Sequence, residues 1–377
     1  MDTGEISAWD FATRQPMRVR WAGGVITHLD AAPHLPPPIL WLAPALFEVQ
    51  INGYAGVDFQ RDNLTTDDLL HATRRLRDAG CAKFLLTLIT DDWASLTARL
   101  RHLRAMRAKS PELQSAIAGW HLEGPFLSSK TGFHGAHDPT LMLDPKPEHI
   151  RELRLLTGND PLLLTLSPER LGSIEAIKLA ASLGIKISLG HTDATAEMLA
   201  RAVQAGATMF THLGNGCPRE LDRHDNILWR VVETTGLTPS VIPDGIHVSP
   251  ALFRLQHRAL GNSLLYTSDA MAAAGAPPGK YTIGKLSVEV GADQIVRQPG
   301  QTNFAGSALR PVDGVFRAAE TLSCPWQEAW ARYSAVPAQL MGINHGLAVG
   351  QPATFCLLKT AGSGALLDLQ TYWNGRS

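Results

Sequence analysis

The middle of the chain repeats one pattern, in which an apolar run of strand length is followed by a stretch with helical periodicity. Eight such runs span residues 47–50, 83–90, 116–123, 161–169, 186–192, 208–213, 240–247 and 264–270. Strands that alternate with helices pair in parallel, and eight such units are what a closed (β/α)8 barrel needs. We therefore predict an α/β fold of the TIM-like barrel type. A doubly wound open sheet is the structural alternative.

Both ends of the chain differ from this middle part. Residues 17–29 alternate apolar and polar side chains around a pair of glycines, as a β-hairpin does, and residues 346–360 also resemble a turn and a strand. We predict a small β-sandwich domain built from residues 1–44 and 345–377, with the barrel at 45–344.

Charge and composition exclude several classes of protein. The 377 residues include 34 basic and 35 acidic side chains, so no basic excess indicates binding to nucleic acid or to an anionic membrane. No window reaches about 18 uninterrupted apolar residues, and the first residues lack a signal-peptide pattern. The four cysteines are scattered, which fits a reducing compartment. We expect a cytoplasmic protein without nucleic-acid or membrane partners.

Polar side chains gather at the carboxyl ends of the predicted strands, where barrels of this type carry their chemistry. Any one of them could be a satisfied polar residue at a strand–loop junction. Five successive strand ends with His, Glu or Asp instead indicate a functional cluster, because buried strands are otherwise apolar. The residues are Gln50, Asn52, His121, Glu123, His191, His212, Asp244, His247 and Asp269.

Three of these residues form a candidate metal site. Glu123, His191 and His212 end three different predicted strands and can converge on one point. Two histidines and one carboxylate make a catalytic zinc set that leaves a position for water. Bound metal would lower the pKa of that water and polarise a carbonyl. We predict one divalent ion, with zinc as the first expectation and iron, cobalt or manganese as alternatives.

The end of the first predicted strand limits the number of metal ions. Many metal-dependent hydrolases with a parallel barrel have His-x-His there, whereas this chain has Gln50 and Asn52. Amides are poor ligands for zinc-like ions, so we expect a single ion rather than two. Gln50 and Asn52 would then form hydrogen bonds to the substrate or to the metal ligands.

Three residues are candidates for proton transfer or substrate contact. Asp269 could take a proton from water and deliver it to a leaving amine, although it could instead cap a helix. His247 could polarise the scissile carbonyl or hold substrate, with a buried histidine bonded to backbone as the alternative. His137 lies in a loop rich in Gly and Pro, where substrate contacts and surface histidines are both common.

The loop after His212 has the features of an anion site. Gly214, Asn215 and Gly216 could present backbone N–H groups, and Arg219 and Arg223 follow. A phosphate or carboxylate on the substrate would fit this arrangement. An ordinary surface loop is the alternative.

Several motifs, taken in order, resemble one family. The chain resembles the N-acetylglucosamine-6-phosphate deacetylases of the amidohydrolase superfamily through most of the barrel and both ends. The motif SDAMAAAG followed by PPG is the most specific. The matching stretches are HLEGPF (121–126), GAHDP (135–139), LGHTDAT (189–195), THLGN (211–215), DGIHVSP (244–250), SDAMAAAGAPPGKYTIG (268–284) and AGSAL (305–309).

The resemblance implies a barrel with a small β-sandwich and hydrolysis of N-acetylglucosamine 6-phosphate to glucosamine 6-phosphate and acetate. It also implies a homodimer, and the Gln-x-Asn branch that this chain resembles uses a single metal. By motif position the implied roles are metal binding for Glu123, His191 and His212; general base and acid for Asp269; amide polarisation for His247; sugar contact for His137; phosphate contact for Asn215 and Gly216, and for Arg223 from the second subunit.

One segment departs from the family pattern. Where Phe or Tyr and then Asn-Ala-Met are usual, residues 214–217 are Gly-Asn-Gly-Cys, and a His224-Asp225 pair is added. A deacylase of a different N-acyl amino sugar or N-acyl amino acid, selected by the loop at 214–225, is therefore a second hypothesis. A catalytically silent sugar-phosphate-binding barrel is a third, and the intact Glu123 and Asp269 argue against it.

Overall fold

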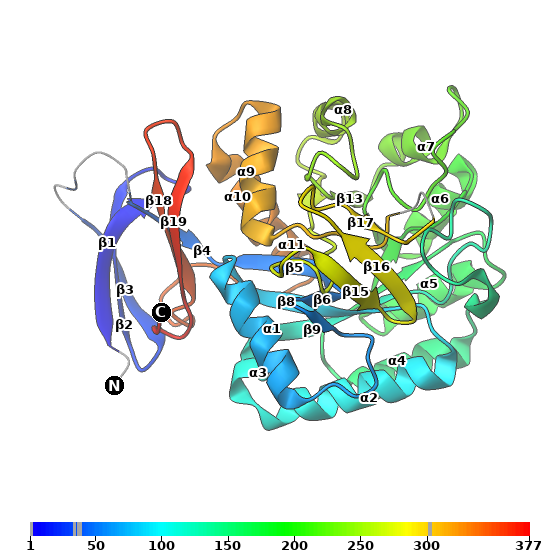
Figure 1. The fold of residues 1–377 in the computed structure, drawn as a ribbon, viewed down its shortest axis with the longest axis horizontal. Coiled ribbons are helices and arrows are strands. Elements are labelled where there is room, and N and C mark those ends of the chain that lie inside the picture. The colour runs from blue at the N-terminus through cyan, green and yellow to red at the C-terminus, as the bar shows by residue number, and fades with distance from the viewer. Residues whose placement is uncertain (1–2, 33–34, 36–39, 301–303) are drawn as a thin grey trace.

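A computed structural model describes residues 3–32, 35, 40–300 and 304–377. Residues 1–2, 33–34 and 36–39 of the predicted small domain lie outside the described residues, as do residues 301–303. Figure 1 shows a sheet built from both chain ends standing beside a larger body in which helices surround a parallel sheet.

The larger body is the predicted barrel. Each predicted strand overlaps an observed one, and neighbours pair in parallel in the order β14-β13-β12-β11-β10-β9-β8-β5. The strands are β5 (Leu46–Ile51), β8 (Cys81–Ile89), β9 (Ile117–Glu123), β10 (Leu162–Leu166), β11 (Lys186–Leu189), β12 (Ala207–Phe210), β13 (Thr238–Val241) and β14 (Leu265–Tyr266).

The first and last strands meet, so the open-sheet alternative is wrong. A parallel bridge joins Ile51 to Ala270, and the N–H of Asn52 donates to the carbonyl of Ala270 at 2.7 Å. The carboxylate of Glu48 reinforces this seam. It accepts 2.9 Å and 2.8 Å hydrogen bonds from the Thr267 hydroxyl and the Ser268 N–H.

Side chains fill the barrel as layers. Leu85, Leu163, Met209 and Leu265 come from the second, fourth, sixth and eighth strands and pack in one apolar cluster with Phe47. Contribution of a layer by alternate strands is the usual packing inside such barrels. The interior is therefore a packed core, and the rim at the strand ends is where a ligand can bind.

Helices cover the outside of the sheet and begin and end where the chain has capping residues. Helix α1 starts after Thr65, whose side chain caps it, and α6 ends at Gly206 with a φ of 119°. The helices are α1 (Thr66–Asp78), α2 (Trp93–Lys109), α3 (Pro111–Ala116), α4 (Pro147–Thr157), α5 (Ser173–Ser182), α6 (Ala196–Ala205), α7 (Ile227–Glu233), α8 (Pro250–Leu260), α9 (Pro311–Leu322), α10 (Trp326–Arg332) and α11 (Ala335–Leu340). A short 3-10 turn, η1, spans Pro139–Leu141.

The two chain ends form one six-stranded sheet, in the order β19-β18-β4-β1-β2-β3. The predicted hairpin around the paired glycines is confirmed as β2 and β3. The strands of the six-stranded sheet are β1 (Gly4–Asp10), β2 (Pro16–Ala22), β3 (Val25–Ala31), β4 (Leu40–Pro44), β18 (Phe355–Thr360) and β19 (Leu366–Tyr372). The domain boundaries at residues 44 and 345 stay a prediction.

A small antiparallel sheet follows β14 and lies over the carboxyl end of the barrel (Figure 1). Asp58 holds it by accepting 2.9 Å hydrogen bonds from Thr282 and from the N–H of Gly284, and Lys285 pairs with Asp91. Its strands are β15 (Gly279–Ile283), β16 (Leu286–Val290) and β17 (Val296–Arg297); the nearby β6 (Gly53–Tyr54) and β7 (Val57–Asp58) form a two-stranded ribbon. None of the described helices is long and apolar enough to cross a membrane.

Candidate active site

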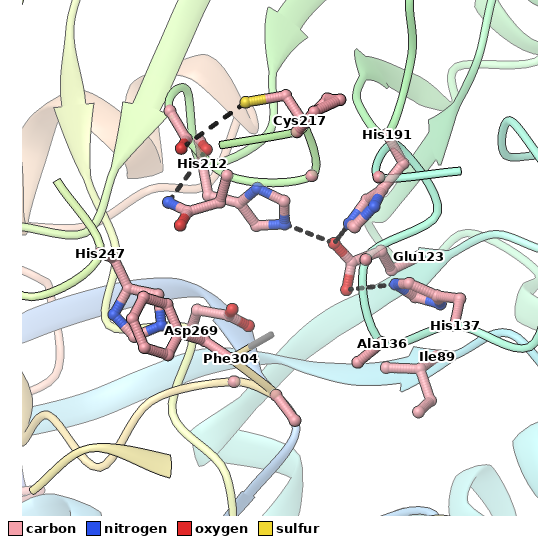
Figure 2. A pocket seen from close by; sticks show the side chains of 18 of the residues that line it. Ile89, Glu123, Ala136, His137, His191, His212, Cys217, His247, Asp269 and Phe304 are labelled. Carbon is pink, nitrogen blue, oxygen red and sulfur yellow. Dashed lines mark hydrogen bonds and ion pairs between the residues drawn. The ribbon is translucent and has the colours of Figure 1, made fainter. Parts of the chain in front are cut away.

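A cavity of about 310 Å³ lies at the carboxyl ends of the barrel strands. Figure 2 shows Glu123, His137, His191 and His212 on one side of it, facing His247 and Asp269. Six of the nine residues of the predicted strand-end cluster therefore meet at one cavity, and Gln50, His121 and Asp244 do not line it. The predicted site residues that line the cavity are Asn52, Glu123, His137, His191, His212, Asn215, Gly216, His247 and Asp269.

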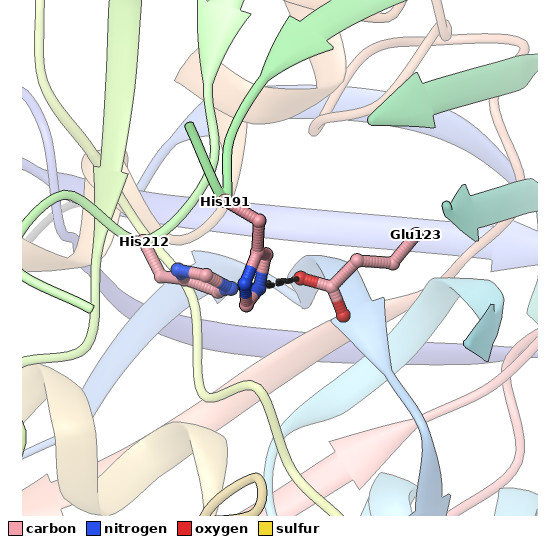
Figure 3. A group of neighbouring side chains, drawn as sticks. All are labelled: Glu123, His191 and His212. Carbon is pink, nitrogen blue, oxygen red and sulfur yellow. Dashed lines mark hydrogen bonds and ion pairs between the residues drawn. The ribbon is translucent and has the colours of Figure 1, made fainter. Parts of the chain in front are cut away.

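Glu123, His191 and His212 form its most compact group (Figure 3). Oε1 of Glu123 lies 2.8 Å from Nε2 of His212 and 3.3 Å from Nε2 of His191. One ligand atom from each residue lies within 4.8 Å of the others, and all three residues are buried. Burial alone would raise the pKa of the Glu123 carboxyl, but hydrogen bonds with His191 and His212 hold it well below its ordinary value. The carboxylate is thus ionised at neutral pH, as a metal ligand must be.

Hydrogen bonding around His191 fits metal binding. The backbone carbonyl of Phe133 lies 2.9 Å from Nδ1 of His191 and can only accept, so Nδ1 carries a proton. In the neutral ring the lone pair is then on Nε2, which faces Glu123. Orientation of a histidine ligand by a carbonyl is usual in metal sites. The residues present therefore fit a divalent cation.

Backbone geometry holds three site residues in place. His191, His212 and Asp269 have φ values of 50°, 33° and 51°, which non-glycine residues seldom adopt. Each such residue costs on the order of 1–3 kcal/mol, and strain of this kind is concentrated at functional sites. A Cβ on Gly216 would lie 2.8 Å from Nδ1 of His191, and one on Gly135 would lie 2.9 Å from its Cε1. The two loops can thus pack against His191 only because Gly135 and Gly216 have no side chain.

Asp269 faces the metal-ligand group from the last strand. Its Oδ1 accepts a 2.7 Å hydrogen bond from the side-chain amide of Asn52. Burial, and next the charge of Glu123, raises the pKa of Asp269 to about 7. Residues after Asp269 form turns rather than a helix, so the alternative of a helix cap is wrong.

His247 is oriented by a neighbouring carboxylate rather than by backbone. Its Nδ1 lies 2.7 Å from Oδ2 of Asp244, while Oδ1 of Asp244 accepts from the N–H groups of Ile246 and His247 at 2.8 Å. Burial would raise the pKa of Asp244, but its contacts with His247 lower it below its ordinary value. Nε2 of His247 is buried without a partner among the described residues, so one polar atom remains for a ligand.

His137 is buried beside the metal-ligand group, so the alternative of a surface histidine is wrong. Its Nδ1 lies 2.9 Å from the hydroxyl of Thr90 and its Nε2 lies 3.8 Å from Oε2 of Glu123. Burial, with the neighbouring histidines, lowers the pKa of His137 to about 3. The ring is neutral at physiological pH and can both donate and accept.

The predicted anion loop is only partly in the site. Asn215 and Gly216 line the cavity, whereas Arg223 is exposed and is not among the residues that line it. Gln50 is also outside the cavity wall; it is buried, with Nε2 lacking a partner within the described part of the chain. His121 bonds Val49 and Thr165 inside the barrel and is too enclosed to be a ligand here.

Arg219, which the sequence predicted as a candidate anion contact, lies on the cavity wall. Three other lining residues were not predicted: Ile283, Leu286 and Phe304 reach the cavity from the segment that includes β15 and β16. The alternating sequence at 279–290 indicates a hairpin. Nothing in that pattern places the hairpin over the barrel, because its position depends on the contacts with Asp58 and Asp91.

Comparisons with known proteins agree on one enzyme. No protein-family model matches the chain. The chain is 32% identical over 329 residues to N-acetylglucosamine-6-phosphate deacetylase of Danio rerio, covering 84% of this chain and 80% of the relative. It is 30% identical over 321 residues to the enzyme of that name from Vibrio furnissii, covering 85% and 78%.

Solved structures with the same fold lead to the same enzyme. A mutant N-acetyl-D-glucosamine-6-phosphate deacetylase from Mycobacterium smegmatis, in complex with N-acetyl-D-glucosamine-6-phosphate, superposes with a TM-score of 0.86 and 28% identity, covering 99% of this chain and 98% of that one. The enzyme from Thermotoga maritima gives 0.85 at 22% identity, with 99% of both chains covered, and supports the fold alone.

Proposed function

Because the chain belongs to the N-acetylglucosamine-6-phosphate deacetylase family, we propose that it hydrolyses N-acetylglucosamine 6-phosphate to glucosamine 6-phosphate and acetate. The observation that carries this proposal is the convergence of a Glu-His-His group, a carboxyl with raised pKa and an unpartnered histidine nitrogen on one cavity. Together these supply the parts that hydrolysis of an amide needs.

We propose that Glu123, His191 and His212 hold one divalent ion. When bound, such an ion lowers the pKa of a water molecule and polarises a carbonyl group. Zinc is the first expectation, and the same ligands accept iron, cobalt and manganese. Asn52 is engaged with Asp269, which supports a single ion at this end of the barrel.

Asp269 is the proposed general base and acid. Its carboxylate accepts a proton from the attacking water and then delivers that proton to the amide nitrogen, so that the amine can leave. A pKa of about 7 suits both halves of this cycle at neutral pH. The Asn52 amide fixes the carboxylate while the second oxygen is left for the water.

His247 is the proposed carbonyl contact. It faces the carbonyl oxygen of the amide through Nε2, the ring nitrogen that has no partner among the described residues. Asp244, 2.7 Å from Nδ1, sets the ring orientation. His137 would hold the sugar hydroxyls, with Asn52 as a further polar group on the cavity wall.

Phosphate binding is assigned to Asn215 and Gly216. Arg223 is exposed, which supports its proposed place opposite the second subunit of a homodimer. We further propose that the protein is cytoplasmic. Its partners would then be its second subunit and a small amino sugar phosphate.

A substrate panel tests the function. The purified protein, supplied with zinc or manganese, is incubated with N-acetylglucosamine 6-phosphate, with N-acetylglucosamine and with N-acetylglutamate, and acetate is measured. We expect the phosphorylated amino sugar to give the highest kcat/KM. Preference for N-acetylglutamate, or for the unphosphorylated sugar, would instead support a deacylase with a different substrate.

A further inference from the structure

The two arginines of the loop after His212 differ in their relation to the catalytic cavity. Arg219 lines the catalytic cavity, and Arg223 does not. Within the described ranges, Arg219 is the one Lys or Arg residue on the wall of this cavity. The sequence alone does not distinguish these two arginines.

A local turn directs Arg223 outward. Oδ1 of Asp222 accepts from the N–H groups of His224 and Asp225 at 2.7 Å and 3.0 Å, and Asn226 donates its side-chain amide to the Asp222 carbonyl at 2.6 Å. Nε of Arg223 donates to His224 at 3.0 Å. Because Asn226 also caps helix α7, the direction of Arg223 is fixed by the start of that helix.

Packing on the other side of the loop holds Arg219 at the cavity. Pro218 lies so close to Gly132 that a Cβ on that glycine would be 2.6 Å from its Cγ. Cys217 and Leu221 are half-buried and pack against the main apolar core. The residues on both sides of Arg219 are therefore anchored, and Arg219, although exposed, lies on the cavity wall.

A cation away from the metal-ligand group would favour binding of an anionic substrate in this cavity. Glu123 and Asp269 both line it, and each repels a phosphate when ionised. A guanidinium presents parallel N–H groups that match two phosphate oxygens, which an ammonium does not. Arg219 lines the same cavity as Asn215 and Gly216, the turn to which phosphate binding is assigned.

We propose that Arg219 is a specificity-determining residue that recognises the phosphate monoester of the substrate from within the same subunit. This inference rests on the proposed function for the identity of the substrate. It assigns to Arg219 of the same subunit a contact that the family resemblance implies for Arg223 of a second subunit.

Kinetics of single-residue variants test the proposal. Arg219→Gln, Arg219→Lys and Arg223→Gln are compared with Arg151→Gln, an exposed arginine on α4 that serves as the matched control. For Arg219→Gln we expect KM for N-acetylglucosamine 6-phosphate to rise roughly 10- to 100-fold, as loss of a charge-assisted contact does, while kcat stays within about threefold. The KM of Arg219→Lys should lie between those of the wild type and Arg219→Gln, and the KM of Arg151→Gln should match the wild type.

The ratio of kcat/KM between phosphorylated and unphosphorylated sugar should fall in Arg219→Gln. An unchanged ratio in that variant, or a fall confined to Arg223→Gln, would overturn the proposal. Circular dichroism and melting temperature check that each variant is folded.

A binding measurement separates failure of this inference from failure of the proposed function. Titration calorimetry with glucosamine 6-phosphate and with inorganic phosphate needs no turnover. If the wild type releases no acetate but binds both ligands through Arg219, the function is wrong and the anion site stands. If it releases acetate while Arg219→Gln binds both ligands as the wild type does, only the Arg219 assignment is wrong. If the wild type binds neither ligand, the Arg219 assignment is also wrong.

Discussion

The side-chain amide of Asn52 donates a 2.7 Å hydrogen bond to Oδ1 of Asp269. These residues follow the first and last strands of the barrel, which meet at the bridge between Ile51 and Ala270. Asn52 thus orients the proposed base across the closing seam of the barrel. This contact gives a physical role to a strand end that lacks the histidine pair of two-metal sites.

The first prediction concerns the role of Asp269 in proton transfer. Asp269→Asn keeps the size of the side chain and its place beside Asn52 but removes the base. We expect kcat for acetate release to fall about 10²- to 10⁴-fold, with metal content unchanged. A variant with near wild-type turnover would rule out this assignment.

The second prediction concerns the pH dependence of the reaction. The hydrogen bond from Asn52 lowers the pKa of Asp269, although burial and the charge of Glu123 raise it overall. Asn52→Leu removes the bond, so the acidic limb of the kcat/KM profile should move to higher pH, because the base must lose its proton before it acts. A limb that stays in place, or moves to lower pH, would contradict this coupling.

The third prediction uses two glycines to separate backbone strain from crowding. Gly184 and Gly216 have φ values of 73° and 62°, but only at Gly216 would a Cβ meet the His191 ring, at 2.8 Å. Gly184→Ala should cost roughly 1–2 kcal/mol of unfolding free energy and leave kcat unchanged. Gly216→Ala should also lower kcat about tenfold or more, because His191 must move. Equal kcat in both variants would show that His191 tolerates the contact.

The fourth prediction concerns Glu48 at the seam. Burial raises its pKa from 4.5 to about 8 in the folded protein. Between these values the folded chain holds a proton that the unfolded chain has released, so the contribution of Glu48 to stability falls as pH rises through this window. Glu48→Gln removes the titration and keeps an oxygen to accept from Ser268.

Urea unfolding at about pH 5 and about pH 8.5 measures this effect. The free energy of unfolding of Glu48→Gln, relative to the wild type, should rise between the two conditions. Glu175→Gln, at an exposed position of α5, is the control and should show no such change. An equal difference at both pH values would mean that Glu48 is ionised throughout.

Much of the barrel and its site could be predicted because the pattern is local. Each apolar run stands next to a helix in the sequence, and the polar residue that ends it, such as Glu123 or His212, necessarily lies at the carboxyl rim. The strand ends alone were enough to predict that Glu123 and His212 meet at the rim. The distances between them needed the structure.

Other features depend on contacts between distant parts of the chain and gave no local signal. Glu48 lies in the first barrel strand, where the sequence pattern predicts only buried positions. Its partners Thr267 and Ser268 follow the last barrel strand, far away in the sequence. Phe304 reaches the cavity from a segment beyond the last strand. Which of Arg219 and Arg223 faces the cavity depends on a turn whose geometry the sequence does not fix by itself.

Acetate release from N-acetylglucosamine 6-phosphate, measured as a function of bound metal, tests whether Glu123, His191 and His212 form a catalytic metal site. Protein stripped by a chelator is reloaded stepwise with zinc, and released acetate and metal content are measured on the same samples. We predict that turnover disappears on stripping and rises in proportion to metal until one ion is bound per chain. Full turnover by the stripped protein, or no acetate at any metal content, would contradict the assignment of Glu123, His191 and His212 as a catalytic metal site.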